Sequence, residues 1–79
     1  MEWRDRIVVD PEVVFGRPVV KGTRLAVAFV IDLLAHGCTV EEVLDNYPQL
    51  TREDIHACLA YAGDLVQEQV VYPVGAAPG

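Results

Sequence analysis

The chain has 79 residues and 52% hydrophobic side chains, 14 of them valine, so it predicts one small folded domain and excludes intrinsic disorder. Its 12 acidic and 6 basic residues give a net charge of −6, which argues against a general polyanion binder. No apolar run approaches the length of about eighteen residues that a membrane span needs, and the first ten residues are too charged for a signal peptide. We therefore expect a cytoplasmic protein with no membrane partner.

The first third of the chain, residues 1–27, predicts a short β-ribbon. Its valine-rich pieces suit a half-buried pleated surface, and turn formers such as Gly16-Arg17-Pro18 and Lys21-Gly22-Thr23 separate them. Extended pieces are expected at residues 6–9, 12–15, 18–21 and 24–27. A two-stranded ribbon is not stable alone, so it must lie on helices or pair with a second copy of itself.

Helical signals begin after the ribbon. The apolar run 28–35 predicts a first helix that is buried on most sides and closed by Gly37. Thr39 and Glu42 form a capping box, so a second helix begins directly after Thr39. That helix is short because Pro48 pushes the residue before it out of the helical region.

The third helix is expected over residues 52–69, with Thr51 as its N-cap. Apolar residues recur at the helical spacing and predict a single buried face made of Ile55, Cys58, Leu59, Ala62, Leu65 and Val66. The predicted fold class is mainly α with a small β part: a ribbon over 1–27, then a tri-helical, homeodomain-like helix-turn-helix bundle over 28–69. Together these form one domain, residues 1–69, and an apolar tail follows at 70–79.

Residues for catalysis or metal binding are not grouped in the sequence. No nucleophile, general base and orienting group occur together, so we expect neither an enzyme nor a cofactor. Cys38 and Cys58 each follow a histidine by two positions, but residues two apart on a helix point about 200° apart and do not chelate one ion. We expect two reduced, buried cysteines, with a disulfide or a zinc site as the less favoured alternatives.

A short capped helix, a turn and a longer capped helix form the pattern of a DNA-binding helix-turn-helix. The chemistry fits poorly, since the third helix exposes Arg52 against two acids, and Glu53 and Asp54 at its start would repel phosphates. A bundle that does not contact DNA is therefore the favoured interpretation. If nucleic acid or a partner is bound, the candidate contacts are Arg17, Lys21, Thr23, Arg24 and Arg52.

Several sequence blocks together resemble a known family. They are Ile7, Asp10-Pro11, Gly16-x-Pro18, Gly22-Thr23-Arg24, Gly37, Glu41-Glu42-Val43, Tyr47-Pro48 and Leu50 to Ile55. Over about residues 7–65 the chain resembles the family of proteins of unknown function numbered 433. The Gly-x-Pro and Gly-Thr-Arg blocks are specific as a pair, and Ala26 is a departure where the family often has proline.

The resemblance implies a small prokaryotic helix-turn-helix-like antitoxin that pairs with a toxin of the PIN-nuclease-like class. An acidic helical body is compatible with covering a basic nuclease surface. We expect a homodimer, because the ribbon and the tail leave much hydrophobic surface for so small a domain. The function predicted is a non-catalytic binding module that neutralises the nuclease and represses its own operon. The alternatives are a stand-alone DNA-binding regulator and a structural homodimer with no nucleic-acid role.

The Gly22-Thr23-Arg24 block has two interpretations. It either forms a tight turn, in which Arg24 pairs with a local carboxylate such as Asp10 and joins ribbon to helix, or it binds a ligand. The tight turn is favoured.

Overall fold

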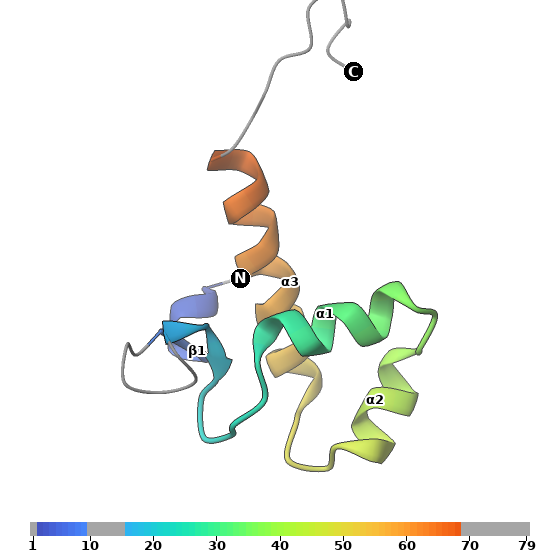
Figure 1. Cartoon of the computed structure of the whole chain (residues 1–79). Coiled ribbons are helices and arrows are strands. Elements are labelled where there is room, and N and C mark those ends of the chain that lie inside the picture. The colour runs from blue at the N-terminus through green and yellow to red at the C-terminus, as the bar shows by residue number, and fades with distance from the viewer. Residues whose placement is uncertain (1, 10–15, 69–79) are drawn as a thin grey trace, which may run out of the picture.

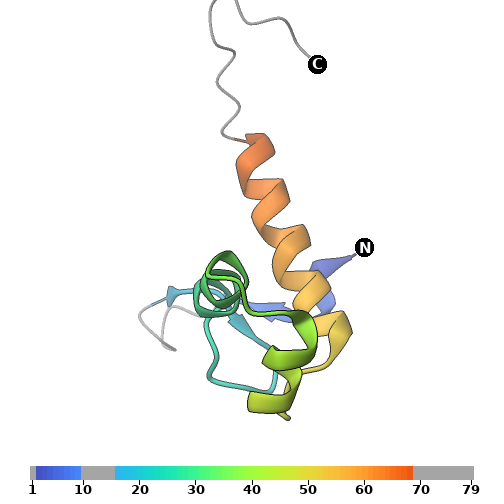
Figure 2. The same cartoon turned by 90° about the vertical axis from the view of Figure 1, so that its right-hand side faces the viewer.

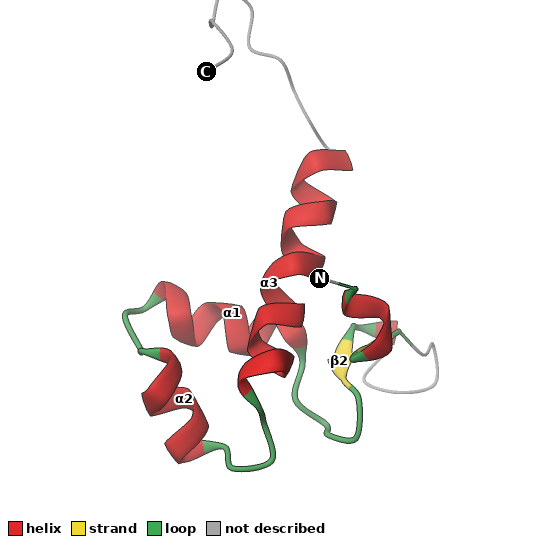
Figure 3. Ribbon diagram, turned by 180° about the vertical axis from the view of Figure 1, so that it is seen from behind, coloured by secondary structure: helices red, strands yellow, loops and turns green. Residues whose placement is uncertain are grey.

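The computed structural model describes residues 2–9 and 16–68, and three helices make up most of this part (Figures 1 and 3). The elements are a short 3₁₀ helix η1 (Trp3–Asp5), strands β1 (Ile7–Val8) and β2 (Val19–Val20), and helices α1 (Val27–Ala35), α2 (Val40–Asn46) and α3 (Arg52–Glu68). The expected mainly helical fold with a small N-terminal sheet is confirmed. Residues 12–15, expected to be extended, lie outside the described residues.

The two strands form an antiparallel ribbon that is covered within the chain. Ile7 pairs with Val20, and Val8 pairs with Val19. Ile7 and Val20 are buried in the same core as the helices, so the ribbon's apolar side rests on the bundle. Figures 1 and 3 place the ribbon and α2 on opposite sides of the first turns of α3. The ribbon therefore needs no second copy to cover it.

Local signals set the start of α2 as expected. In the capping box of α2, the Glu42 backbone N–H donates to the Thr39 hydroxyl at 3.1 Å, and the Thr39 N–H donates to the Glu42 carboxylate at 3.0 Å. Helix α1 begins at Val27, one residue earlier than expected, after Ala26, which provides no side-chain cap. It is followed by Gly37 at φ 98°, a left-handed conformation that glycine adopts without strain.

The core lies where the ribbon and the three helices meet. The largest fully buried side chains are Ile55, Val20, Val30, Val43 and Cys58, and they come from β2 and from all three helices. Each helix therefore contributes to one shared core. Within the described residues, none of the helices has the length and hydropathy that crossing a membrane requires.

The apolar face predicted for α3 is buried over only part of its length. Ile55 and Cys58 are fully buried, whereas Leu59, Leu65 and Val66 are 46%, 43% and 69% exposed. For Leu65 and Val66 the reason is geometric, because the second half of α3 projects beyond α1 and α2 (Figures 1 and 2). Leu59 lies in the first half, about 100° around the helix from the buried Cys58, and is turned away from the core. The expectation of a continuously buried face is wrong for these three residues.

Candidate interaction surfaces

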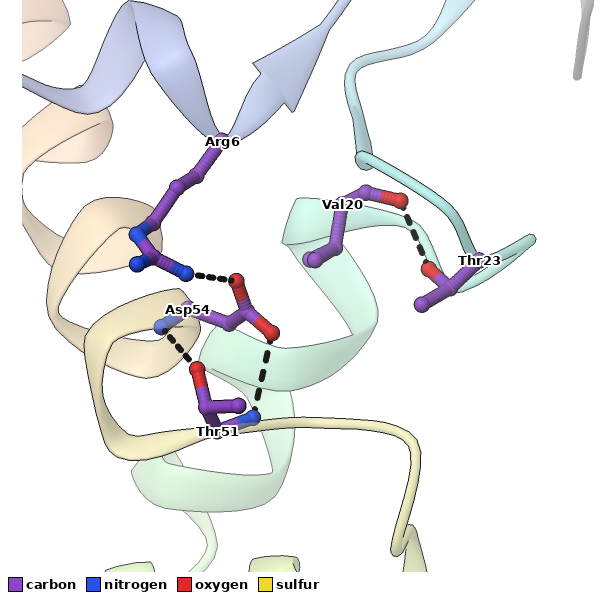
Figure 4. A network of polar contacts seen from close by, with 5 residues as sticks. All are labelled: Arg6, Val20, Thr23, Thr51 and Asp54. Carbon is purple, nitrogen blue, oxygen red and sulfur yellow. Dashed lines mark hydrogen bonds and ion pairs between the residues drawn. The ribbon is translucent and has the colours of Figure 1, made fainter.

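The start of α3 is tied to the ribbon by one carboxylate (Figure 4). Asp54 accepts from the Thr51 backbone N–H at 3.0 Å through Oδ2 and from Arg6 Nη1 at 3.1 Å through Oδ1. The Asp54 backbone N–H donates in turn to the Thr51 hydroxyl at 3.1 Å, which completes a capping box. Asp54 is 8% exposed, so the expectation that it lies on the outer face of the helix is wrong.

Sequence reasoning did not identify Arg6 and Asp54 as partners. The spacing from Thr51 to Asp54 is that of a capping box, and this was the available signal for an inward carboxylate. Arg6 lies 48 positions away, and its contact with Asp54 depends on the tertiary fold.

A small polar cleft of about 260 Å³ lies beside this ion pair. It is lined by Asp5, Arg6, Lys21 and Asp54, and the Lys21 backbone N–H donates to the Arg6 carbonyl at 2.7 Å. Two cations face two carboxylates, so the cleft exerts no net attraction on an anion. We assign it a structural role.

The Gly22-Thr23-Arg24 block forms the favoured tight turn. The Thr23 hydroxyl donates to the Val20 carbonyl at 2.7 Å (Figure 4). It also accepts from the Leu25 N–H at 3.0 Å, and Gly22 has φ 79°. The pairing of Arg24 with Asp10 lies outside the described residues, since Asp10 is among those not described. Among the described residues, the ion pair that joins the ribbon to a helix is Arg6 with Asp54.

The five candidate contacts predicted from the sequence lie in different places. Arg17 borders a groove between α1 and α3, and Lys21 borders the polar cleft. Thr23 and Arg24 belong to the turn after β2, where Arg24 is exposed. Arg52 pairs with Glu41 of α2 at 2.7 Å. Within the part of the chain that the structure describes, no one pocket gathers all five.

The surface formed by α2 and the first turn of α3 is acidic. Its exposed acids are Glu41, Glu42, Asp45 and Glu53, and we call this set the acidic surface. Arg52, the one cation in the three helices, donates to Glu41 and lowers the pKa of that carboxyl by this hydrogen bond. The acidic surface thus carries net negative charge.

A second surface, which we call the apolar groove, runs between the start of α1 and the second half of α3. Its volume is about 310 Å³. The lining residues used below are Arg17, Ala26, Ala28, Ile31, Ala62 and Leu65. Tyr61 also lines the groove and packs edge-on against Trp3 of η1 at 4.7 Å between ring centroids. The Trp3 indole donates to Asp64 at 2.6 Å, so η1 supports the half of α3 that forms this wall.

The two cysteines differ in burial. Both thiols are free, Cys58 is fully buried and Cys38 is half-buried. Burial, with a smaller contribution from the negative charge of Asp54, raises the pKa of the Cys58 thiol to about 11. The Cys58 thiol therefore stays protonated and unreactive near neutral pH. The described residues contain no group of three side chains suited to a metal ion.

The model of the family described as "Protein of unknown function (DUF433)" matches residues 7–62. The chain belongs to DUF433. The crystal structure of a DUF433 member protein from Anabaena variabilis superposes with a TM-score of 0.75 and 29% identity, covering 82% of this chain and 64% of that chain. "Uncharacterized protein y4eO" of Sinorhizobium fredii is 37% identical over 59 residues, which are 75% of this chain and 27% of that protein. The chain thus spans about a quarter of this relative and just under two thirds of the crystallised DUF433 chain.

Proposed function

We propose that this DUF433 chain is a small, non-catalytic binding module of the antitoxin type, which neutralises a PIN-nuclease-like toxin and represses its own operon. The observation that carries the proposal is the acidic surface, which has four exposed acids and one cation, Arg52, that is already paired with Glu41. A nuclease that binds a polyanion needs a basic surface, and an acidic partner is complementary to it.

A stand-alone DNA-binding regulator is the second candidate, because α2, a turn and α3 follow one another as in a helix-turn-helix. Two features rank it lower. Arg52, at the start of the helix that would enter the major groove, is engaged by Glu41, and Glu53 beside it is exposed. The burial of Asp54 removes one repelling charge but adds no contact to a base. A structural homodimer with no nucleic-acid role is the third candidate.

The proposal is tested first on the neighbouring reading frame, which is expected to encode a PIN-like nuclease, and then with that nuclease, purified alone and mixed with the chain. The wild-type chain is expected to bind the nuclease and to stop RNA cleavage at equimolar ratio. The double variant Asp45→Lys/Glu53→Lys is expected to weaken inhibition by about tenfold or more, because it reverses two exposed charges that cap no helix. Asp32→Lys is the matched control, since it reverses an exposed acid on α1.

Equal inhibition by all three proteins would refute the acidic surface as the contact. Absence of binding, combined with tight binding to the DNA upstream of the chain's own gene, would favour the regulator instead. Absence of both activities would leave the structural homodimer.

A further inference from the structure

The apolar groove between α1 and α3 has the size and the lining of a small-molecule site. Its volume of about 310 Å³ falls at the lower end of the range of about 300–1,000 Å³ that ligand pockets occupy. Such pockets are mostly apolar and contain a few polar groups that orient the ligand. The apolar groove has both features, because alanine, isoleucine and leucine side chains line it beside one arginine, Arg17.

We propose that the apolar groove binds a small amphiphilic carboxylate, such as a medium-chain fatty acid, with its hydrocarbon part between α1 and α3 and its carboxylate on Arg17. The proposal goes beyond the antitoxin-type function and does not rest on it, because none of the residues of the acidic surface lines this groove.

Small side chains leave the space that the hydrocarbon part fills. Ala26 and Ala28 lie at the start of α1 and Ala62 lies in the second half of α3, so the side chains at these lining positions end at Cβ. Ile31 and Leu65 are larger and offer further contact to a hydrocarbon chain. Leu65 is 43% exposed, and a bound hydrocarbon chain removes part of this apolar surface from water.

Charge determines the polar group of the ligand. Arg17 is the charged residue among the described residues that line the groove, so an anionic group is favoured there and a cationic group is repelled. A guanidinium presents a planar fork of N–H donors that can bond both oxygens of a carboxylate at once. An uncharged hydroxyl group makes a weaker bond to the same donors, so the carboxylate is preferred over it.

The backbone holds Arg17 beside the groove. Gly16 before it has φ 77°, a conformation that glycine adopts without strain, and the ring of Pro18 after it fixes the next φ. The Pro18 carbonyl accepts from the backbone N–H of Val27, the first residue of α1, at 3.0 Å. The segment that carries Arg17 is therefore fastened to the helix that forms one wall of the groove.

The binding test uses the whole chain, sodium octanoate as the anionic probe and 1-octanol as its uncharged counterpart. Trp3 is the one tryptophan of the chain and packs on Tyr61, which lines the groove, so Trp3 fluorescence reports binding. Octanoate is expected to bind saturably with a Kd of about 1 mM or below, and to shift the NMR signals of the lining residues. Octanol is expected to bind at least about tenfold more weakly.

Two pairs of variants locate the site. Arg17→Gln should remove the preference for octanoate over octanol, whereas Arg24→Gln, at an exposed cation outside the groove lining, should keep it. Ala62→Leu should fill the groove and raise the Kd of both probes at least about tenfold. Ala60→Leu is its matched control, since Ala60 is also half-buried on α3 but points about 200° away and lies outside the lining. Circular dichroism checks that each variant is folded.

Three results would overturn the proposal. One is the absence of saturable octanoate binding up to about 10 mM. Another is octanol binding as tightly as octanoate to the wild-type chain, because Arg17 would then not hold the carboxylate. The third is octanoate binding that Ala62→Leu leaves intact, because the probe would then bind elsewhere. If the chain does not bind octanoate but Ala62→Leu abolishes nuclease inhibition, the groove contacts the nuclease, and the carboxylate site is wrong while the antitoxin-type function stands.

Discussion

The two halves of α3 carry similar apolar side chains in opposite surroundings. Ile55 and Cys58 in the first half are fully buried, whereas Leu65 and Val66 in the second half are 43% and 69% exposed. Leu59 in the first half is 46% exposed because it is turned away from the core. The first half is enclosed by the ribbon, α1 and α2, and the second half projects beyond them (Figure 2). A continuous apolar stripe along a helix thus specifies which face is to be covered. The stripe does not specify whether the residues that bury this face belong to the same chain.

The polar contacts of the two halves of α3 also differ in burial. Arg6 reaches the inward carboxylate of Asp54 in the first half, where the acid also caps the helix. Trp3 reaches Asp64 in the second half, at the molecular surface. One N-terminal segment therefore contacts both halves, but its contact with the first half is partly buried and its contact with the second half is exposed.

The largest expected effect is a loss of free energy of unfolding, and it should differ between variants in the two halves of α3. Ile55→Ala removes a fully buried side chain and should lower the free energy of unfolding by about 3 kcal/mol, because a cavity remains in a packed core. Leu65→Ala should change it by less than about 0.5 kcal/mol, because that side chain is 43% exposed and leaves no enclosed cavity. Urea denaturation followed by circular dichroism measures both. Similar losses in the two variants would mean that the second half is covered within its own chain.

The next prediction compares the contributions of two adjacent acids, Asp54 and Glu53, to the free energy of unfolding. Asp54→Asn should cost about 2 kcal/mol, because it weakens both the cap on the Thr51 N–H and the pair with Arg6 at a buried position. Glu53→Gln, at the exposed neighbouring position, should leave the free energy of unfolding nearly unchanged. Thermal and urea denaturation of the two variants measure this difference in the free energy of unfolding. If Glu53→Gln is the more destabilising change, the inward orientation of Asp54 is wrong.

The features that were predictable from the sequence are those whose causes lie within a few residues. The capping box of Thr39 and Glu42 and the stop before Pro48 depend on neighbours alone, so the boundaries of α2 follow from the sequence. The direction of Asp54 depends on Arg6, 48 positions away, and no local pattern contains that contact. The same limit applies to the candidate contacts, because their positions on separate surfaces depend on how the ribbon packs against the helices.

A smaller effect concerns the surface contact of the second half. Trp3→Phe keeps an aromatic ring against Tyr61 but removes the indole donor to Asp64. We expect amide exchange in residues 61–67 to become faster by about fivefold, because a single hydrogen bond is worth about 1 kcal/mol in local opening. Exchange in the first half of α3 should not change. Hydrogen exchange measured by mass spectrometry on peptides from each half provides the comparison, and equal acceleration in both halves would contradict it.

The smallest effect lies on the acidic surface. The hydrogen bond from Arg52 lowers the pKa of the Glu41 carboxyl, so the folded state favours the ionised form. The pair therefore contributes stability above the pKa that Glu41 has in the unfolded chain, and this contribution is lost as the pH falls through the lowered value. Arg52→Ala should return the pKa of Glu41 upward to its ordinary range, as seen in an NMR titration of the side-chain carboxyl carbon. The melting temperature at pH 7 should scarcely change, since both side chains are exposed. An unchanged titration of Glu41 would mean that Arg52 is not held by it, and Arg52 would then regain its place among the candidate contacts to phosphate.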